Sequence, residues 1–268
     1  MTTRLPVLFL GHGSPMTVLT DCPERRVWQA LGQVLPRPRA VLVISAHWQT
    51  QGASHVTSEA MPRTIHDFGG FPDELFAMRY PAPGDPVLAR RVVELLGAER
   101  ARGDESWGFD HGSWCVMQPI YPAADVPMIQ LSLDRALSPD QMLAVGAALA
   151  PLRDEGVLIV ASGNVVHNLR EYMRSRGTQP DWAVQFQGRI TDAVIADDRA
   201  GLTRFAPDDQ AAALAINSAE HYLPLLYAVG ARLQGDEVAV FNDSIDGALS
   251  MTSYLIGDAA LAKALPSG

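Results

Sequence analysis

Three histidines stand directly after short apolar stretches of the sequence. His12 lies in the run Gly-His-Gly-Ser-Pro (residues 11–15), His47 in Ser-Ala-His-Trp (45–48) and His167 in Ser-Gly-Asn-Val-Val-His-Asn (162–168). Imidazole is the commonest protein ligand for iron, zinc and copper, and three imidazoles from separate elements leave coordination positions open for a substrate. Because His12 stands between two glycines, it has little packing reason to be buried, which favours a metal role.

A fourth histidine, His221, comes shortly before Pro224, which is accommodated best in the first turn of a helix. Such a helix start can face the same crevice as the ends of strands. A buried histidine bonded to a backbone carbonyl would explain His167 or His221 equally well, and His66 and His111 taken alone are more typical of surface positions. The residues by themselves predict a site of several histidines and leave its exact ligands open.

The elements that must position these side chains can be read from the hydrophobic pattern. Runs rich in β-branched residues predict strands buried on both faces, at 7–10, 40–45, 128–133, 157–161 and 238–241. Helical patterns lie between them, at 24–35, 86–96, 139–152, 182–196 and 208–231. Ser138, Pro139 and Gln141 predict a capped helix start, whereas 61–83 and 106–122 lack periodicity and predict long ordered loops.

Alternating strands and helices predict an α/β fold with a central, mostly parallel or mixed sheet flanked by helices. A chain of 268 residues with 47% hydrophobic content can bury one large core, and we expect a single domain over residues 1–268. The C-terminal ends of parallel strands converge on a ligand crevice, so His12, His47 and His167 are expected to meet there.

Charge and cysteine content narrow the expected partners. The net charge is -9 and there is no basic run, so nucleic acid is an unexpected partner. The apolar run at 5–10 is too short for a signal peptide or a membrane span, and two cysteines, Cys22 and Cys115, do not make a disulfide framework. We expect a cytoplasmic protein without membrane contact, as a monomer or small homo-oligomer.

Six segments taken together, and in this order, carry a family resemblance that spans nearly the whole chain. They are residues 11–15, 45–48, 67–72 (Asp-Phe-Gly-Gly-Phe-Pro), 110–114 (Asp-His-Gly-Ser-Trp), 162–168 and 220–225 (Glu-His-Tyr-Leu-Pro-Leu). In these segments the chain resembles the class III extradiol ring-cleavage dioxygenases, and within them the 4,5-DOPA dioxygenase group.

The resemblance implies Fe(II) as the active metal, and zinc can occupy the same nitrogen site. It makes His12 and His47 metal ligands and puts the third ligand in the pair Glu220-His221. We take His221 as that ligand, with Glu220 as its neighbour.

The resemblance also implies roles around the metal. His167 matches an acid/base histidine that can become a fourth ligand to zinc, and His111 matches a loop histidine near the substrate. Ser14 and Asn168 are predicted to bind substrate. Gly69 stands where the DOPA-type group is expected to have a tyrosine, so the pocket should be larger or differently shaped.

The implied reaction is the opening of a catechol ring by O2 beside its hydroxyls, to give a muconic semialdehyde-type product. Two other functions fit the same histidines: a zinc-dependent hydrolase, and a non-catalytic relative that only binds a ligand. Dependence on O2 separates the first alternative from an oxygenase, and turnover of any catechol excludes the second.

Overall fold

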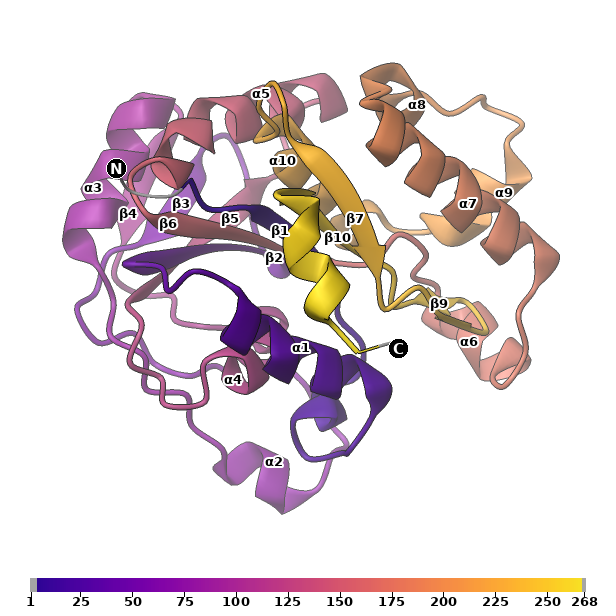
Figure 1. Cartoon of the computed structure of the whole chain (residues 1–268), viewed down its shortest axis with the longest axis horizontal. Coiled ribbons are helices and arrows are strands. Elements are labelled where there is room, and N and C mark those ends of the chain that lie inside the picture. The colour runs from indigo at the N-terminus through magenta and orange to yellow at the C-terminus, as the bar shows by residue number, and fades with distance from the viewer. Residues whose placement is uncertain (1–3, 267–268) are drawn as a thin grey trace.

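A computed structural model describes residues 4–266, which form one α/β domain around an eight-stranded mixed sheet (Figure 1). The strand order is β4-β3-β5-β2-β6-β1-β10-β7. The strands of this sheet are β1 (Val7–Gly11), β2 (Ala40–Thr50), β3 (Ser54–Thr57), β4 (Ala101–Asp104), β5 (Met128–Asp134), β6 (Val157–Gly163), β7 (Glu237–Phe241) and β10 (Ser253–Gly257). A separate short pair consists of β8 (Ile245–Asp246) and β9 (Leu249–Ser250).

The four central strands, β5-β2-β6-β1, run parallel, so their C-terminal ends lie at one edge of the sheet. The pairs β3–β5, β1–β10 and β10–β7 are antiparallel. The expected α/β fold with a mixed sheet is therefore confirmed.

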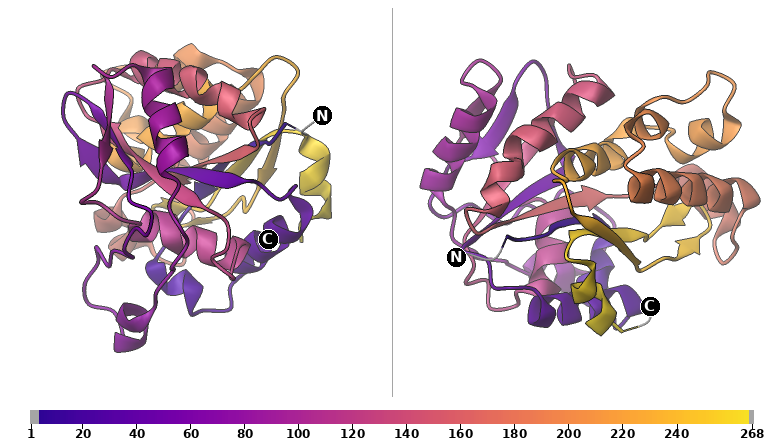
Figure 2. Two further views of the ribbon diagram at one scale, coloured as in Figure 1. Left: turned by 90° about the vertical axis from the view of Figure 1, so that its left-hand side faces the viewer. Right: turned by 45° about the horizontal axis from the view of Figure 1, so that its top comes forward.

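Helices cover both faces of the sheet (Figure 2). The α-helices are α1 (Pro23–Val34), α2 (Asp73–Ala77), α3 (Pro86–Leu96), α4 (His111–Ile120), α5 (Pro139–Leu149), α6 (Leu169–Ser175), α7 (Asp181–Ala196), α8 (Arg199–Thr203), α9 (Gln210–Ala215) and α10 (Leu223–Gly230). The 3-10 helices are η1 (Pro15–Val18), η2 (Ala150–Arg153), η3 (Ala219–His221) and η4 (Ala259–Ala264).

The two faces hold separate cores because side chains alternate along each strand. In β1, Val7 and Phe9 pack in the core with α3, α5, α7 and α10, while Leu8 and Leu10 pack in the core with α1 and α4. The predicted start of α5 is also confirmed. Ser138 Oγ accepts from the Gln141 amide at 3.3 Å, and Gln141 Oε1 accepts from the Ser138 amide at 2.8 Å.

The expectation of a loop over 106–122 is wrong, because α4 begins at His111. Asp110 caps the helix by accepting a hydrogen bond from the Ser113 amide at 3.1 Å. All residues of α4 except Gln118 are buried. A helix buried on every side has no polar face, so it shows no amphipathic period in the sequence. The other expected loop, 61–83, is largely irregular and contains only the short helix α2.

The prediction of one long helix over 208–231 is also wrong. The structure divides it into α9, η3 and α10, with a break at Asn217 and Ser218. Pro224 lies in the first turn of α10, as its missing amide requires. The break turns His221 toward the ends of the strands.

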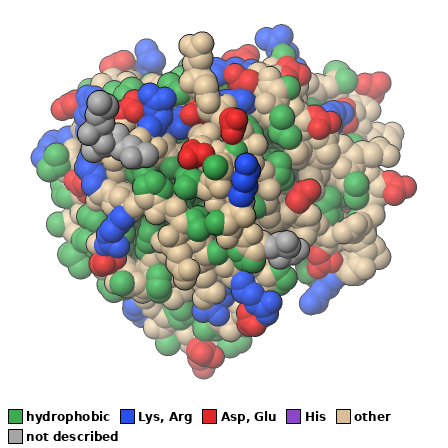
Figure 3. Space-filling view, viewed as in Figure 1, with side chains coloured by type: hydrophobic (Ala, Val, Ile, Leu, Met, Phe, Trp, Pro, Cys, Tyr) green, Lys and Arg blue, Asp and Glu red, His purple; other side chains and the backbone are tan. Residues whose placement is uncertain are grey.

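Within residues 4–266, no helix has the length and apolar character needed to cross a membrane. Figure 3 shows acidic and basic side chains interspersed over the face of the molecule turned toward the viewer, with no basic patch on that face.

Candidate metal centre

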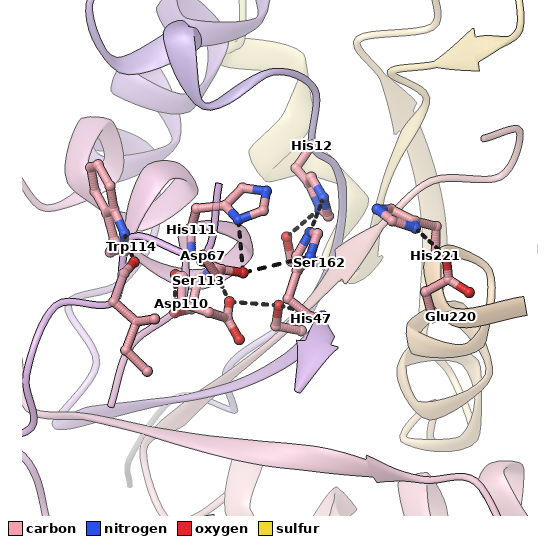
Figure 4. A network of polar contacts seen from close by, with 12 residues as sticks. His12, His47, Asp67, Asp110, His111, Ser113, Trp114, Ser162, Glu220 and His221 are labelled. Carbon is pink, nitrogen blue, oxygen red and sulfur yellow. Dashed lines mark hydrogen bonds and ion pairs between the residues drawn. The ribbon is translucent and has the colours of Figure 1, made fainter. Parts of the chain in front are cut away.

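His12, His47 and His221 come together near the C-terminal ends of the central strands (Figure 4). One side-chain nitrogen from each of the three lies within 4.8 Å of the other two. The His12 and His47 Nε2 atoms are 3.0 Å apart, and the three ring centroids are separated by 5.1 to 5.3 Å. Three imidazole nitrogens converging on one point are a donor set that suits Fe, Zn or Cu.

His12 is held by the parallel pairing of β1 with β6. It directly follows β1, its amide donates to the Gly163 carbonyl at 3.0 Å, and its Nδ1 lies 2.9 Å from Ser162 Oγ. With Nδ1 bound to the hydroxyl, Nε2 is the nitrogen left for a metal. A Cβ on Gly11 would lie 2.5 Å from the backbone of Met251, so only glycine fits before this histidine.

His47 lies within β2, past the point where β2 stops pairing with β6 at Ser45. The register between β2 and β5 shifts between Ile44 and Gln49, and such an irregularity redirects the side chains within it. The ring of His47 has its Nδ1 3.7 Å from Asp67 Oδ2.

His221 ends the short helix η3. Its Nδ1 is 3.2 Å from Glu220 Oε1, which also accepts a hydrogen bond from Ser218 Oγ at 2.8 Å. The other ring nitrogen of His221 points toward His12 (Figure 4). Glu220 thus orients His221 from behind, as carboxylates do for metal-binding histidines.

Asn164 connects the segments that carry His12 and His221. Its side-chain amide donates to the His12 carbonyl at 2.6 Å and to the Ser250 carbonyl at 2.8 Å, and its backbone amide donates to the His221 carbonyl at 2.7 Å. Asn164 is 1% exposed. This residue fixes the spacing of two of the three imidazoles without facing the cavity.

His167 and His111 flank the three-histidine group. The His167 ring stacks on His221 with centroids 3.4 Å apart and an interplanar angle of 4°. The His111 ring lies 3.9 Å from the His47 ring. Asp67 accepts from the His111 amide at 2.9 Å and has Oδ2 3.0 Å from His111 Nδ1, a contact at ion-pair distance without the direction of a good hydrogen bond.

The electrostatics keep the imidazoles neutral, which is the form that binds metal. Burial lowers the pKa of His12 and of His47 well below the ordinary value, and neighbouring histidines lower both further. Burial also lowers the pKa of His221, against the opposing effect of Glu220. Burial and then His221 lower the pKa of His167 to about 3.

The carboxyl groups of Glu220 and Asp67, which contact these histidines, stay ionised near pH 7. The hydrogen bond from His221 lowers the pKa of Glu220 to about 2. Burial would raise the pKa of Asp67, yet its contacts with His111 outweigh burial and lower that pKa.

The five histidines line a cavity of about 810 Å³, a size typical of small-molecule sites. Its walls are largely apolar and include Phe68 and Phe71. Ser14 also lines the cavity, and its Oγ accepts from the Met16 amide at 3.2 Å.

Asn168 does not line the cavity. It caps α6 by accepting from the Glu171 amide at 3.1 Å, and it donates to the Leu214 carbonyl at 2.9 Å.

Sequence reasoning did not find four residues that support the histidines: Ser45, Asp67, Ser162 and Asn164. All four stand in the segments that carried the family resemblance, but no pattern within those segments shows which histidine each one contacts; Ser45 Oγ, for example, accepts from the His47 amide at 3.2 Å. The expectation of a surface position for His111, taken alone, is wrong, because in α4 the residue is buried and only 8% exposed.

Comparison with known proteins identifies the class. Residues 6–246 match the family described as the catalytic LigB subunit of aromatic ring-opening dioxygenase, so the chain belongs to that family and is an extradiol ring-cleavage dioxygenase. It is 47% identical to the 4,5-DOPA dioxygenase extradiol of Escherichia coli (strain K12), over 96% of each chain. It is 35% identical to the protein of the same name from Beta vulgaris, over 92% of this chain and 94% of that one.

A solved structure agrees with the fold. The crystal structure of an uncharacterized protein from Escherichia coli K12 has a TM-score of 0.80 and 42% identity, and the match covers 95% of this chain and 100% of that chain. The resemblance stated from the sequence motifs is therefore confirmed.

Proposed function

We propose that this dioxygenase uses one Fe(II), held by His12, His47 and His221, to open a catechol ring beside its hydroxyls and release a muconic semialdehyde-type product. The convergence of the three imidazoles on the floor of the cavity carries the proposal. Bound Fe(II) would supply electron transfer between the catechol and O2, which zinc in the same site cannot do.

His167 is proposed as the acid/base group. Its ring lines the cavity beside His221, and a neutral imidazole there has a ring nitrogen that can take a phenolic proton and later return it. His111 is proposed to bond a substrate oxygen through Nε2, because its Nδ1 faces Asp67.

The apolar walls orient the ring and limit water. Phe68 and Phe71 form an edge-to-face pair with centroids 5.4 Å apart, and both line the cavity, so they can pack against a substrate ring. We propose that the Ser14 hydroxyl contacts the substrate directly. For Asn168 we propose an indirect effect, since its amide is already bonded within the protein and holds the segment that carries His167.

The test is anaerobic loading with Fe(II), followed by air and a panel of catechols that includes L-DOPA, caffeate and protocatechuate. We expect a coloured ring-opened product and one O2 consumed per product, measured with an oxygen electrode, and no product from zinc-loaded protein. Cleavage of an ester or amide by the zinc form under nitrogen would instead support a hydrolase. No turnover of any catechol, ester or amide would support a relative that only binds.

A further inference from the structure

The charged residues on the cavity wall are all acidic. Among the described residues that line it, Glu24 and Asp246 carry charge, and none is Lys or Arg. The protein part of the cavity therefore presents negative charge to whatever part of a substrate extends from the ring.

Within residues 4–266, neither carboxylate lies at ion-pair distance from a Lys or Arg side chain. Glu24 accepts a hydrogen bond from Ser244 Oγ at 3.4 Å. Asp246 accepts from Tyr172 Oη at 3.2 Å and from the Gly177 amide at 2.6 Å. Each carboxylate is therefore available to pair with a cationic group of a ligand.

The cavity has room for more than a catechol ring. Leu169, Tyr172 and Met173 follow one another at the i, i+3, i+4 spacing of a single helix face, and all three line the cavity. Leu169 and Met173 are 57% and 78% exposed. This apolar face of α6 lies beside Asp246, which bonds to Tyr172, and suits a short hydrocarbon chain that ends in a polar group.

We infer that the enzyme prefers catechols whose side chain carries an ammonium group and no carboxylate. This inference rests on the proposed function. An ammonium in the cavity is attracted by Glu24 and Asp246, whereas a carboxylate meets two like charges and no basic partner among the lining residues. A zwitterionic side chain gains from the first effect and loses from the second, so it should rank between the two.

Four catechols with the same ring and a similar chain test the ranking: dopamine (cationic), 4-ethylcatechol (neutral), L-DOPA (zwitterionic) and 3,4-dihydroxyphenylpropionate (anionic). We expect kcat/KM for dopamine to be about fivefold higher than kcat/KM for 4-ethylcatechol. We expect kcat/KM for 3,4-dihydroxyphenylpropionate to be about fivefold lower than kcat/KM for 4-ethylcatechol. Raising the ionic strength should compress these ratios, because both carboxylates are reached by solvent. Anaerobic calorimetry of the metal-loaded protein gives the ranking of Kd without turnover.

Two variants assign the preference to these carboxylates. Glu24→Gln and Asp246→Asn should each lower the dopamine to 4-ethylcatechol ratio by about threefold. Asp208→Asn makes the same change in net charge at an exposed position away from the cavity, and should leave the ratio unchanged.

A higher kcat/KM or tighter binding for the propionate than for dopamine would overturn the inference, as would an unchanged ratio in both variants. If all four catechols are opened with similar kcat/KM, the proposed function stands and this inference fails. If no catechol is opened, the proposed function fails, and the anaerobic Kd values still decide whether the cavity selects cations.

Discussion

Gly112 is packed so closely against His47 that adding one methyl group should damage the metal centre. A Cβ at this position would lie 2.7 Å from His47 Cδ2 and 2.5 Å from Ser45 Oγ. Real Cβ atoms do not approach other atoms so closely, and the neighbours cannot move freely. Ser45 is fully buried and donates to Asp110 Oδ1 at 2.7 Å, while His47 belongs to a central strand.

Two opposing effects set the magnitude for Gly112→Ala. Alanine is favoured over glycine in a helix by up to ~1 kcal/mol. Overpacking of a buried site costs about 1–3 kcal/mol. The free energy of unfolding should therefore fall by about 0–2 kcal/mol, and a displaced His47 ring should weaken metal binding by about 10- to 100-fold.

The assay is a competition titration of Zn²⁺ against a chelator, together with urea unfolding of the metal-free protein. Gly188→Ala is the matched control, because Gly188 lies in α7 and a Cβ there would meet nothing within 4 Å. We expect that control to gain up to ~1 kcal/mol of stability with its zinc affinity unchanged. Parental zinc affinity in Gly112→Ala would refute the reasoning that the close contact fixes His47.

Three further predictions concern the surrounding residues. His167→Ala should lower kcat by about 10²- to 10⁴-fold with little change in iron content by elemental analysis; loss of the iron would instead make His167 a ligand. Glu220→Ala should weaken zinc binding by about 10- to 100-fold, whereas His221→Ala should abolish it, and the reverse order would make Glu220 the third ligand. Burial raises the pKa of Asp110 to about 6 from 3.8. Between these two pH values the carboxyl is protonated in the folded protein and ionised in the unfolded chain. Its contribution to stability falls by at most ~3 kcal/mol as pH rises from 4 to 7, and Asp110→Asn should gain stability relative to the parent over that range in urea melts; equal slopes against pH would contradict this.

The strands that could be predicted are those whose burial leaves a continuous apolar run in the sequence. The central strands are buried on both faces and appear as continuous apolar runs, so they were found. The short strands β3, β4 and β10 were not predicted. β4 reads Ala-Arg-Gly-Asp, β3 contains His55, and β10 is a five-residue run bounded by Ser253 and Gly257. Propensity alone also extended one helix through Asn217 and Ser218, where the chain has to turn to bring His221 to the site.

The meeting of His12, His47 and His167 could be predicted because the ends of parallel strands lie together, so position along the chain implies position in space. The hydrogen-bonding and ion-pair partners of the histidines could not be predicted. Ser162 is 150 residues from His12, and Asp67 is 44 residues from His111. Contacts of that kind depend on how loops pack, which no local period encodes.

The placement of protons explains why Asp67 belongs to the site. His12 and His47 have their Nε2 atoms 3.0 Å apart, so in the neutral pair one of these nitrogens donates a proton to the other. When both nitrogens ligate a metal, that proton has to leave, and neutral His47 must carry its proton on Nδ1. Asp67 Oδ2 lies 3.7 Å from this Nδ1 and favours the tautomer that metal binding requires. The same oxygen lies 3.0 Å from His111 Nδ1. The Asp67 carboxylate therefore contacts both His47, a proposed metal ligand, and His111, proposed to contact the substrate. Loss of this carboxylate should disturb both rings.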